Sequence, residues 1–99
     1  MLLSHAHTLA LARSSLAALA DQAATIDASS AYERVLIELD RVHGDQSPAT
    51  DNTGRREGPE ILLAVATAAV EDLERHGVDR LTVELILAMV ADAADLDVT

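Results

Sequence analysis

The first quarter of the chain repeats an apolar residue every seven positions. The two sets of repeat positions are Leu2, Leu9, Leu16 and Ala23, and, offset from these, His5, Ala12, Leu19 and Ile26. An α-helix has about 3.6 residues per turn, so both sets fall on one narrow stripe of its surface. A stripe of this width suits a helix packed within a bundle. The pattern therefore predicts an amphipathic helix over about residues 2–26.

The heptad register breaks after this segment. The next apolar positions, which do not continue it, are Tyr32, Val35, Leu36, Leu39 and Val42. Ser30 and Glu33 have the spacing of a capping box, in which a serine oxygen accepts from the backbone N–H three residues on. We therefore expect a second helix over about 30–43, after a tight turn near 27–30. One helix of about 40 residues is the alternative, because no Gly or Pro intervenes.

Two further helices are predicted after a long polar segment. Residues 44–58 lack periodicity and contain three of the four glycines, which indicates a loop. Pro59 suits the first position of a helix, and Gly77 suits the position just past a helix end. We expect helices over about 59–76 and 80–95, with the last one starting at Asp79 or Thr82.

The composition predicts how these helices pack. The chain has 19 Ala and 15 Leu, a single Tyr, and no Phe or Trp. Without large rings to fill space, close approach of helices through Ala is the natural way to close the core. We predict one all-α domain, a four-helix and mostly antiparallel bundle of two helical hairpins.

The fourth helix is apolar almost all round. Between Val83 and Val90 the only charged residue is Glu84. A helix of this kind is buried on every side, and three neighbours in a 99-residue chain do not cover every face. We therefore expect a homodimer, or another protein partner, with a contact built from Val83, Ile86, Leu87, Met89 and Val90.

The charge pattern limits which kinds of binding partner are expected. The formal net charge is −10, and residues 59–99 carry −7 of it. Such a surface repels nucleic acid and anionic membranes. The sequence has no run of 18 apolar residues, so no membrane span is predicted. The absence of Cys is compatible with a location in the cytoplasm. The expected function is a non-catalytic interaction or assembly module without a cofactor.

A metal-binding helical protein is an alternative. In an up-down-up-down bundle, the first helix starts at the end where the second finishes, so His5, His7 and His43 would converge near Asp45. Imidazole and carboxylate groups are ligands for zinc and other transition metals. However, His5 and His7 are two residues apart and point to nearly opposite sides of a helix.

A regulatory protein is the second alternative. Residues 73–90, with a turn at Gly77, have the outline of a degenerate helix-turn-helix. The helix that would read DNA has Arg80 as its only cation, whereas such helices bring basic and amide side chains to phosphates and bases. Motifs for hydrolases and nucleotide binding are absent, so an enzyme is not indicated.

Overall fold

The computed structural model of the chain describes residues 3–44 and 57–98. These residues form the helices α1 (Leu3–Gln22), α2 (Ile26–His43), α3 (Pro59–Asp72) and α4 (Arg80–Val98). A 3₁₀ turn, η2 (Leu73–His76), continues α3. No strand occurs in this part of the chain, so the predicted all-α class is confirmed.

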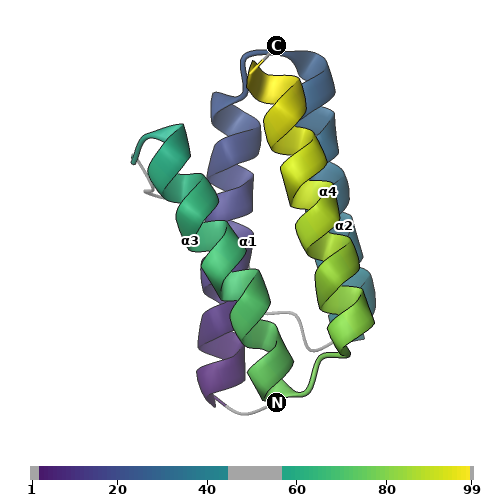
Figure 1. The fold of residues 1–99 in the computed structure, drawn as a ribbon. Coiled ribbons are helices and arrows are strands. Elements are labelled where there is room, and N and C mark those ends of the chain that lie inside the picture. Colours follow the sequence, from purple (N-terminus) through teal and green to yellow (C-terminus); the bar gives the residue numbers. More distant parts are fainter. Residues whose placement is uncertain (1–2, 45–56, 99) are drawn as a thin grey trace.

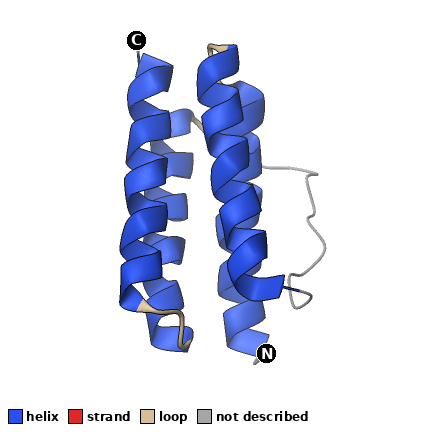
Figure 2. Ribbon diagram, turned by 90° about the vertical axis from the view of Figure 1, so that its right-hand side faces the viewer, coloured by secondary structure: helices blue, strands red, loops and turns tan. Residues whose placement is uncertain are grey.

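The helices lie side by side, and their directions differ from the up-down-up-down order (Figure 1). α1 packs against both α2 and α3, and α2 packs against α4. The turn between α1 and α2 lies at one end of the molecule, and the turn between η2 and α4 lies at the other (Figure 2). Since α3 begins beside the end of α1, the chain runs up, down, down and up. The order assumed for the metal-site prediction was therefore wrong for the third and fourth helices.

The turn between the first two helices comes earlier than the sequence suggested. α1 ends at Gln22, and α2 begins at Ile26. The side chain of Thr25 accepts a hydrogen bond from the backbone N–H of Ala28, at 3.1 Å, which caps α2. Ser30 lies inside this helix, so the predicted capping box was wrong. The break also rules out the single long helix.

The remaining helix ends agree more closely with the sequence. Pro59 is the first residue of α3, and Gly77 follows η2 with φ of 99°, a left-handed conformation that glycine adopts without strain. The Asp79 carboxylate accepts from the N–H groups of Leu81 and Thr82, so Asp79 caps α4 and Thr82 does not. α4 extends beyond residue 95, to Val98. Most of the predicted loop, residues 45–56, lies outside the described residues.

The core is built from one face of each helix. Its members in α1 and α2 are Leu9, Ala12, Leu16, Leu19, Ala20, Tyr32, Val35 and Leu39, and its members in α3, η2 and α4 are Leu62, Ala66, Ala69, Val70, Leu73, Val83, Ile86, Val90 and Ala93. Alanines on α1 and α3 let these two helices approach closely. Burial raises the pKa of Tyr32, the one Tyr in a chain without Phe or Trp, and the negative charge of Asp97 adds to this effect.

Polar contacts join the helices at their edges. Arg13 of α1 forms an ion pair with Asp40 of α2. The carboxylate of Asp97, near the end of α4, accepts from the backbone N–H of Ala24 at 2.8 Å. The side-chain amide of Gln22 donates to the carbonyl of Glu57 at 3.2 Å. The last two contacts bring the end of α1 to the start of α3 and the end of α4.

The capping contact gives a direct test of where α2 begins. Thr25→Ala removes the acceptor for the N–H of Ala28, and loss of such a cap costs about 1 kcal/mol of unfolding free energy. Ser30→Ala is the matched control and should change this free energy by less than about 0.5 kcal/mol, because Ser30 caps nothing in α2. Urea unfolding followed by circular dichroism measures both. A larger loss of unfolding free energy for Ser30→Ala than for Thr25→Ala would contradict the observed start of α2.

Candidate functional site

Three histidines meet at one end of the molecule, from three different elements. His5 lies near the start of α1, His43 is the last residue of α2, and His76 is the last residue of η2. α1 starts where α2 and η2 finish, so the chain directions bring these rings together (Figure 1). We call this set the histidine cluster. All three rings are partly buried.

The hydrogen bonds of His43 define the protonation of two rings. Nδ1 of His43 lies 2.7 Å from the backbone carbonyl oxygen of Leu39, which can only accept, so this nitrogen carries the proton. Nε2 of neutral His43 is therefore an acceptor. It lies 3.1 Å from Nε2 of His5, which must donate. The pair thus has one fixed arrangement of protons when both rings are neutral.

The histidine cluster disfavours a positive charge on His5. The rings of His5 and His76 stack with centroids 5.2 Å apart and an interplanar angle of 8°. The rings of His5 and His43 meet edge to face at 5.1 Å. Burial lowers the pKa of His5, and the nearby His43 and His76 rings lower it further. His5 therefore tends to be neutral in the folded protein.

His76 is also held from α1 and α3. Thr8 donates to Oδ2 of Asp72 at 3.2 Å, and Nε2 of His76 lies 3.5 Å from the same oxygen. Nε2 of His76 also lies 3.4 Å from the Thr8 hydroxyl. Arg75 approaches the other carboxylate oxygen of Asp72, at 3.7 Å. Asp72 therefore joins α1 to the end of α3 and orients His76.

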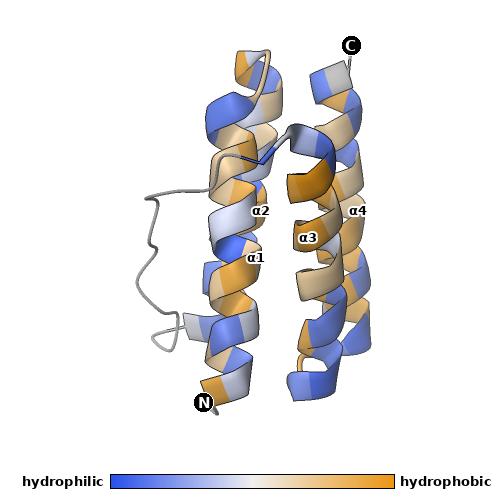
Figure 3. Cartoon of the chain, turned by 90° about the vertical axis from the view of Figure 1, so that its left-hand side faces the viewer, coloured by the Kyte–Doolittle hydropathy of each residue, from blue (hydrophilic) through white to orange (hydrophobic). Residues whose placement is uncertain are grey.

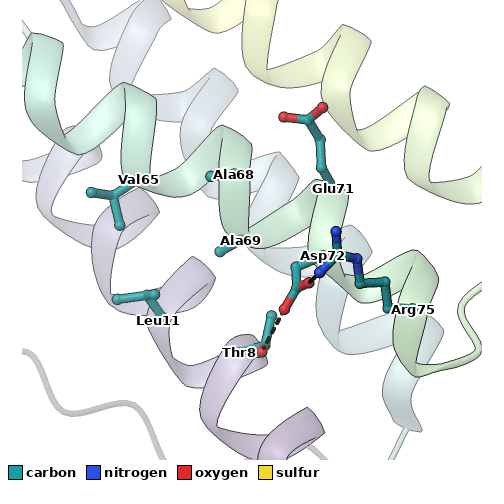
Figure 4. A pocket seen from close by; sticks show the side chains of 8 residues that line it. All are labelled: Thr8, Leu11, Val65, Ala68, Ala69, Glu71, Asp72 and Arg75. Carbon is teal, nitrogen blue, oxygen red and sulfur yellow. Dashed lines mark hydrogen bonds and ion pairs between the residues drawn. The ribbon is translucent and has the colours of Figure 1, made fainter.

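Two depressions border these residues. A cavity of about 380 Å³ opens beside the histidine cluster, and its lining also includes Val42, Val78, Asp79 and Thr82. An open groove of about 590 Å³ runs between α1 and α3, lined by Leu11 and Val65 among others (Figure 4). Figure 3 shows that the apolar residues of α3 lie mainly in its first part and that its last part is mostly hydrophilic. The walls of the cavity are partly polar and partly apolar, whereas the groove is mainly apolar.

The structure brings together part of the predicted metal set. His5 and His43 lie side by side as expected, whereas His7 is exposed and is absent from the histidine cluster. Asp45 lies outside the described residues. Among the residues that are described, no three His, Cys, Asp or Glu side chains are placed so that they could hold a metal ion.

His76 was missing from the sequence-based set. An up-down-up-down order places the end of the third helix far from the start of the first, and this order excluded His76. The structure reverses the third helix and brings His76 to His5. The sequence contains one feature that relates His76 to His43. The segments LDRVHG and LERHG each end a helix with histidine and glycine.

The residues expected to form an interface on α4 are placed differently. Val83, Ile86 and Val90 are buried in the core of the single chain, so they are not available on its surface. Leu87 and Met89 are partly buried against the same core. The large apolar residues of α4 that are exposed are Leu81, Leu85 and Leu96. The exposed apolar residues of α4 are therefore different from the residues predicted to form the contact.

The arrangement of α3 and α4 does not favour the helix-turn-helix alternative. Helices of that motif cross at a steep angle, whereas α3 and α4 run alongside each other (Figure 1). The guanidinium of Arg80 lies 3.4 Å from a carboxylate oxygen of Glu84 on the same helix.

Comparison of the chain with protein-family models, curated proteins and solved structures found no match. Within the described residues, no helix is both long enough and apolar enough to cross a membrane.

The lowered pKa of His5 predicts how stability depends on pH. The unfolded chain takes up a proton on His5 near the ordinary value of 6.5, whereas the folded chain does so at lower pH. The contribution of His5 to the free energy of unfolding is therefore fully present above pH 6.5. This contribution is lost as the pH falls through the pKa of His5 in the folded protein. Urea unfolding in the presence of a chelator should show this loss, and His5→Gln should reduce it. His7→Gln is the control, because His7 is exposed. If this variant reduced the loss of stability at low pH as much as His5→Gln does, the assignment of that loss to His5 would be contradicted.

Proposed function

We propose that this chain is a non-catalytic assembly module, an antiparallel four-helix bundle that forms a homodimer through the outer face of α4. The observation that supports this proposal is the exposure of three leucines on one helix. Leu81 is 74% exposed, Leu85 is 53% exposed and Leu96 is 42% exposed. Apolar side chains that share a helix face in this way commonly mark a contact surface.

The spacing of these leucines suits a two-fold contact. Leu81, Leu85, Ala88 and Leu96 lie within one outward sector of α4, which also contains the exposed Asp92, and Ala88 is near the middle of this set. When two copies of a helix pair in opposite directions, residues equidistant from the centre meet each other. A centre next to Ala88 places Leu81 of one copy opposite Leu96 of the other. The small side chain of Ala88 lets the two helices approach closely at the centre.

The charges of α4 favour this opposite direction. Arg80 lies at the start of the helix, and Asp92 and Asp95 lie in its last part, all of them exposed. Antiparallel pairing brings Arg80 of one copy near the acidic end of the other. Parallel pairing would place carboxylate against carboxylate, which is destabilising. The helix dipoles also favour antiparallel pairing, because the partial positive charge at the N-terminus of one helix then lies near the partial negative charge at the C-terminus of the other.

The proposal predicts the effect of a charge at the centre of the contact. Ala88→Arg places two like charges together on the two-fold axis and should raise the dissociation constant of the dimer roughly 100-fold. Light scattering behind size exclusion, over a dilution series, measures this change. Circular dichroism should show unchanged helix content, because Ala88 is exposed in the single chain.

The matched control for this variant is Ile61→Arg. Ile61 is also exposed, at 56%, but lies on α3. We expect this variant to keep the dissociation constant of the unmodified protein. A monomer at every concentration of the unmodified protein, or a dimer lost through Ile61→Arg and kept in Ala88→Arg, would contradict the proposed interface.

A further inference from the structure

We propose that His5 and His43 form a two-imidazole site for a transition-metal ion such as Zn²⁺ or Ni²⁺, with water completing the coordination shell. This site is independent of the proposed dimer. It uses side chains of α1 and α2, whereas the proposed interface uses the outer face of α4.

The distance between the two donor atoms fits this role. Nε2 of His5 lies 3.1 Å from Nε2 of His43. Imidazole nitrogens bind zinc at about 2.0–2.1 Å, so two of them on one tetrahedral ion lie about 3.3 Å apart. Binding therefore requires only a small separation of the rings, within the freedom of two partly buried side chains.

His43 already has the outer contact that metal-binding histidines use. Such histidines almost always donate their second N–H to a carbonyl or carboxylate, which fixes the ring and leaves the other nitrogen for the metal. Nδ1 of His43 donates to the backbone carbonyl of Leu39 at 2.7 Å. The lone pair of Nε2 consequently points toward His5, where the ion would sit.

The protonation of His5 has to change when the ion binds. In the metal-free protein, Nε2–H of His5 donates to His43. Both Nε2 atoms need a lone pair to bind the ion, so the proton of His5 moves from Nε2 to Nδ1. Neutral His5 gives up no net proton in this step.

The surroundings favour an open site with water ligands. His76 stacks on His5, but its Nε2 is directed to Thr8 and Asp72. It therefore acts as a neighbour of the ligand pair and not as a third ligand. The cavity of about 380 Å³ beside the rings gives space for water. Nitrogen donors with exchangeable waters suit zinc, nickel and copper better than magnesium or calcium.

The test uses the untagged full chain, freed of metal by a chelator and then dialysed. Zn²⁺ or Ni²⁺ at ten times its dissociation constant should raise the melting temperature by roughly 5–10 °C. Mg²⁺ at the same concentration should cause no rise. Calorimetric titration should give one ion per chain. In NMR spectra, the imidazole signals of His5 and His43 should shift with zinc, and the signals of His7 should stay unchanged.

Variants separate this site from binding elsewhere. His43→Gln and His5→Gln should each abolish the metal-dependent rise, and glutamine limits the loss of packing. His7→Gln is the matched control, because His7 is on the same helix as His5 but is exposed. Circular dichroism of the metal-free variants confirms that they fold. An unchanged melting temperature of the unmodified protein, or a rise that survives His43→Gln and disappears in His7→Gln, would overturn the proposal.

Discussion

The packing of α1 is the constraint on which the other helices depend. Its buried face contacts α2 and α3 along most of its length, and Leu9 and Leu16 on this face are fully buried. With no Phe or Trp in the chain, the core closes through leucines and through alanines that let helices approach. The same helix also aligns both ends of the molecule, since its start meets His43 and His76 and its end meets Glu57.

The sequence predicted the elements well because their signals are local. Heptad spacing identified the buried leucines of α1, and Pro59 and Gly77 marked helix ends through their own backbone preferences. The start of α2 was missed because the Ser30–Glu33 pattern fits a capping box as well as it fits a helix interior. The direction of α3 was missed because a loop of about 15 residues reaches either end of the bundle. That direction alone decides whether His76 joins the histidine cluster.

The α4 helix shows why an apolar run does not reveal its own inner face. Its residues between Val83 and Val90 are apolar on several sides, so periodicity could not choose among them. The neighbouring helices decide that Val83, Ile86 and Val90 enter the core and that Leu81 and Leu85 stay outside. The proposed interface and the proposed metal site thus have a common cause. Both follow from how the four helices are arranged and not from any single segment.

The central claim, that two copies meet at the outer face of α4, can be tested with one introduced thiol. The chain has no cysteine, so Ala88→Cys creates a single thiol at the proposed two-fold axis. Mild oxidation at low protein concentration should give a disulfide-linked dimer, because cysteines bridge when their Cα atoms come within about 7 Å. Ile61→Cys should stay monomeric under the same conditions. Efficient crosslinking through Ile61→Cys, with none through Ala88→Cys, would contradict the account.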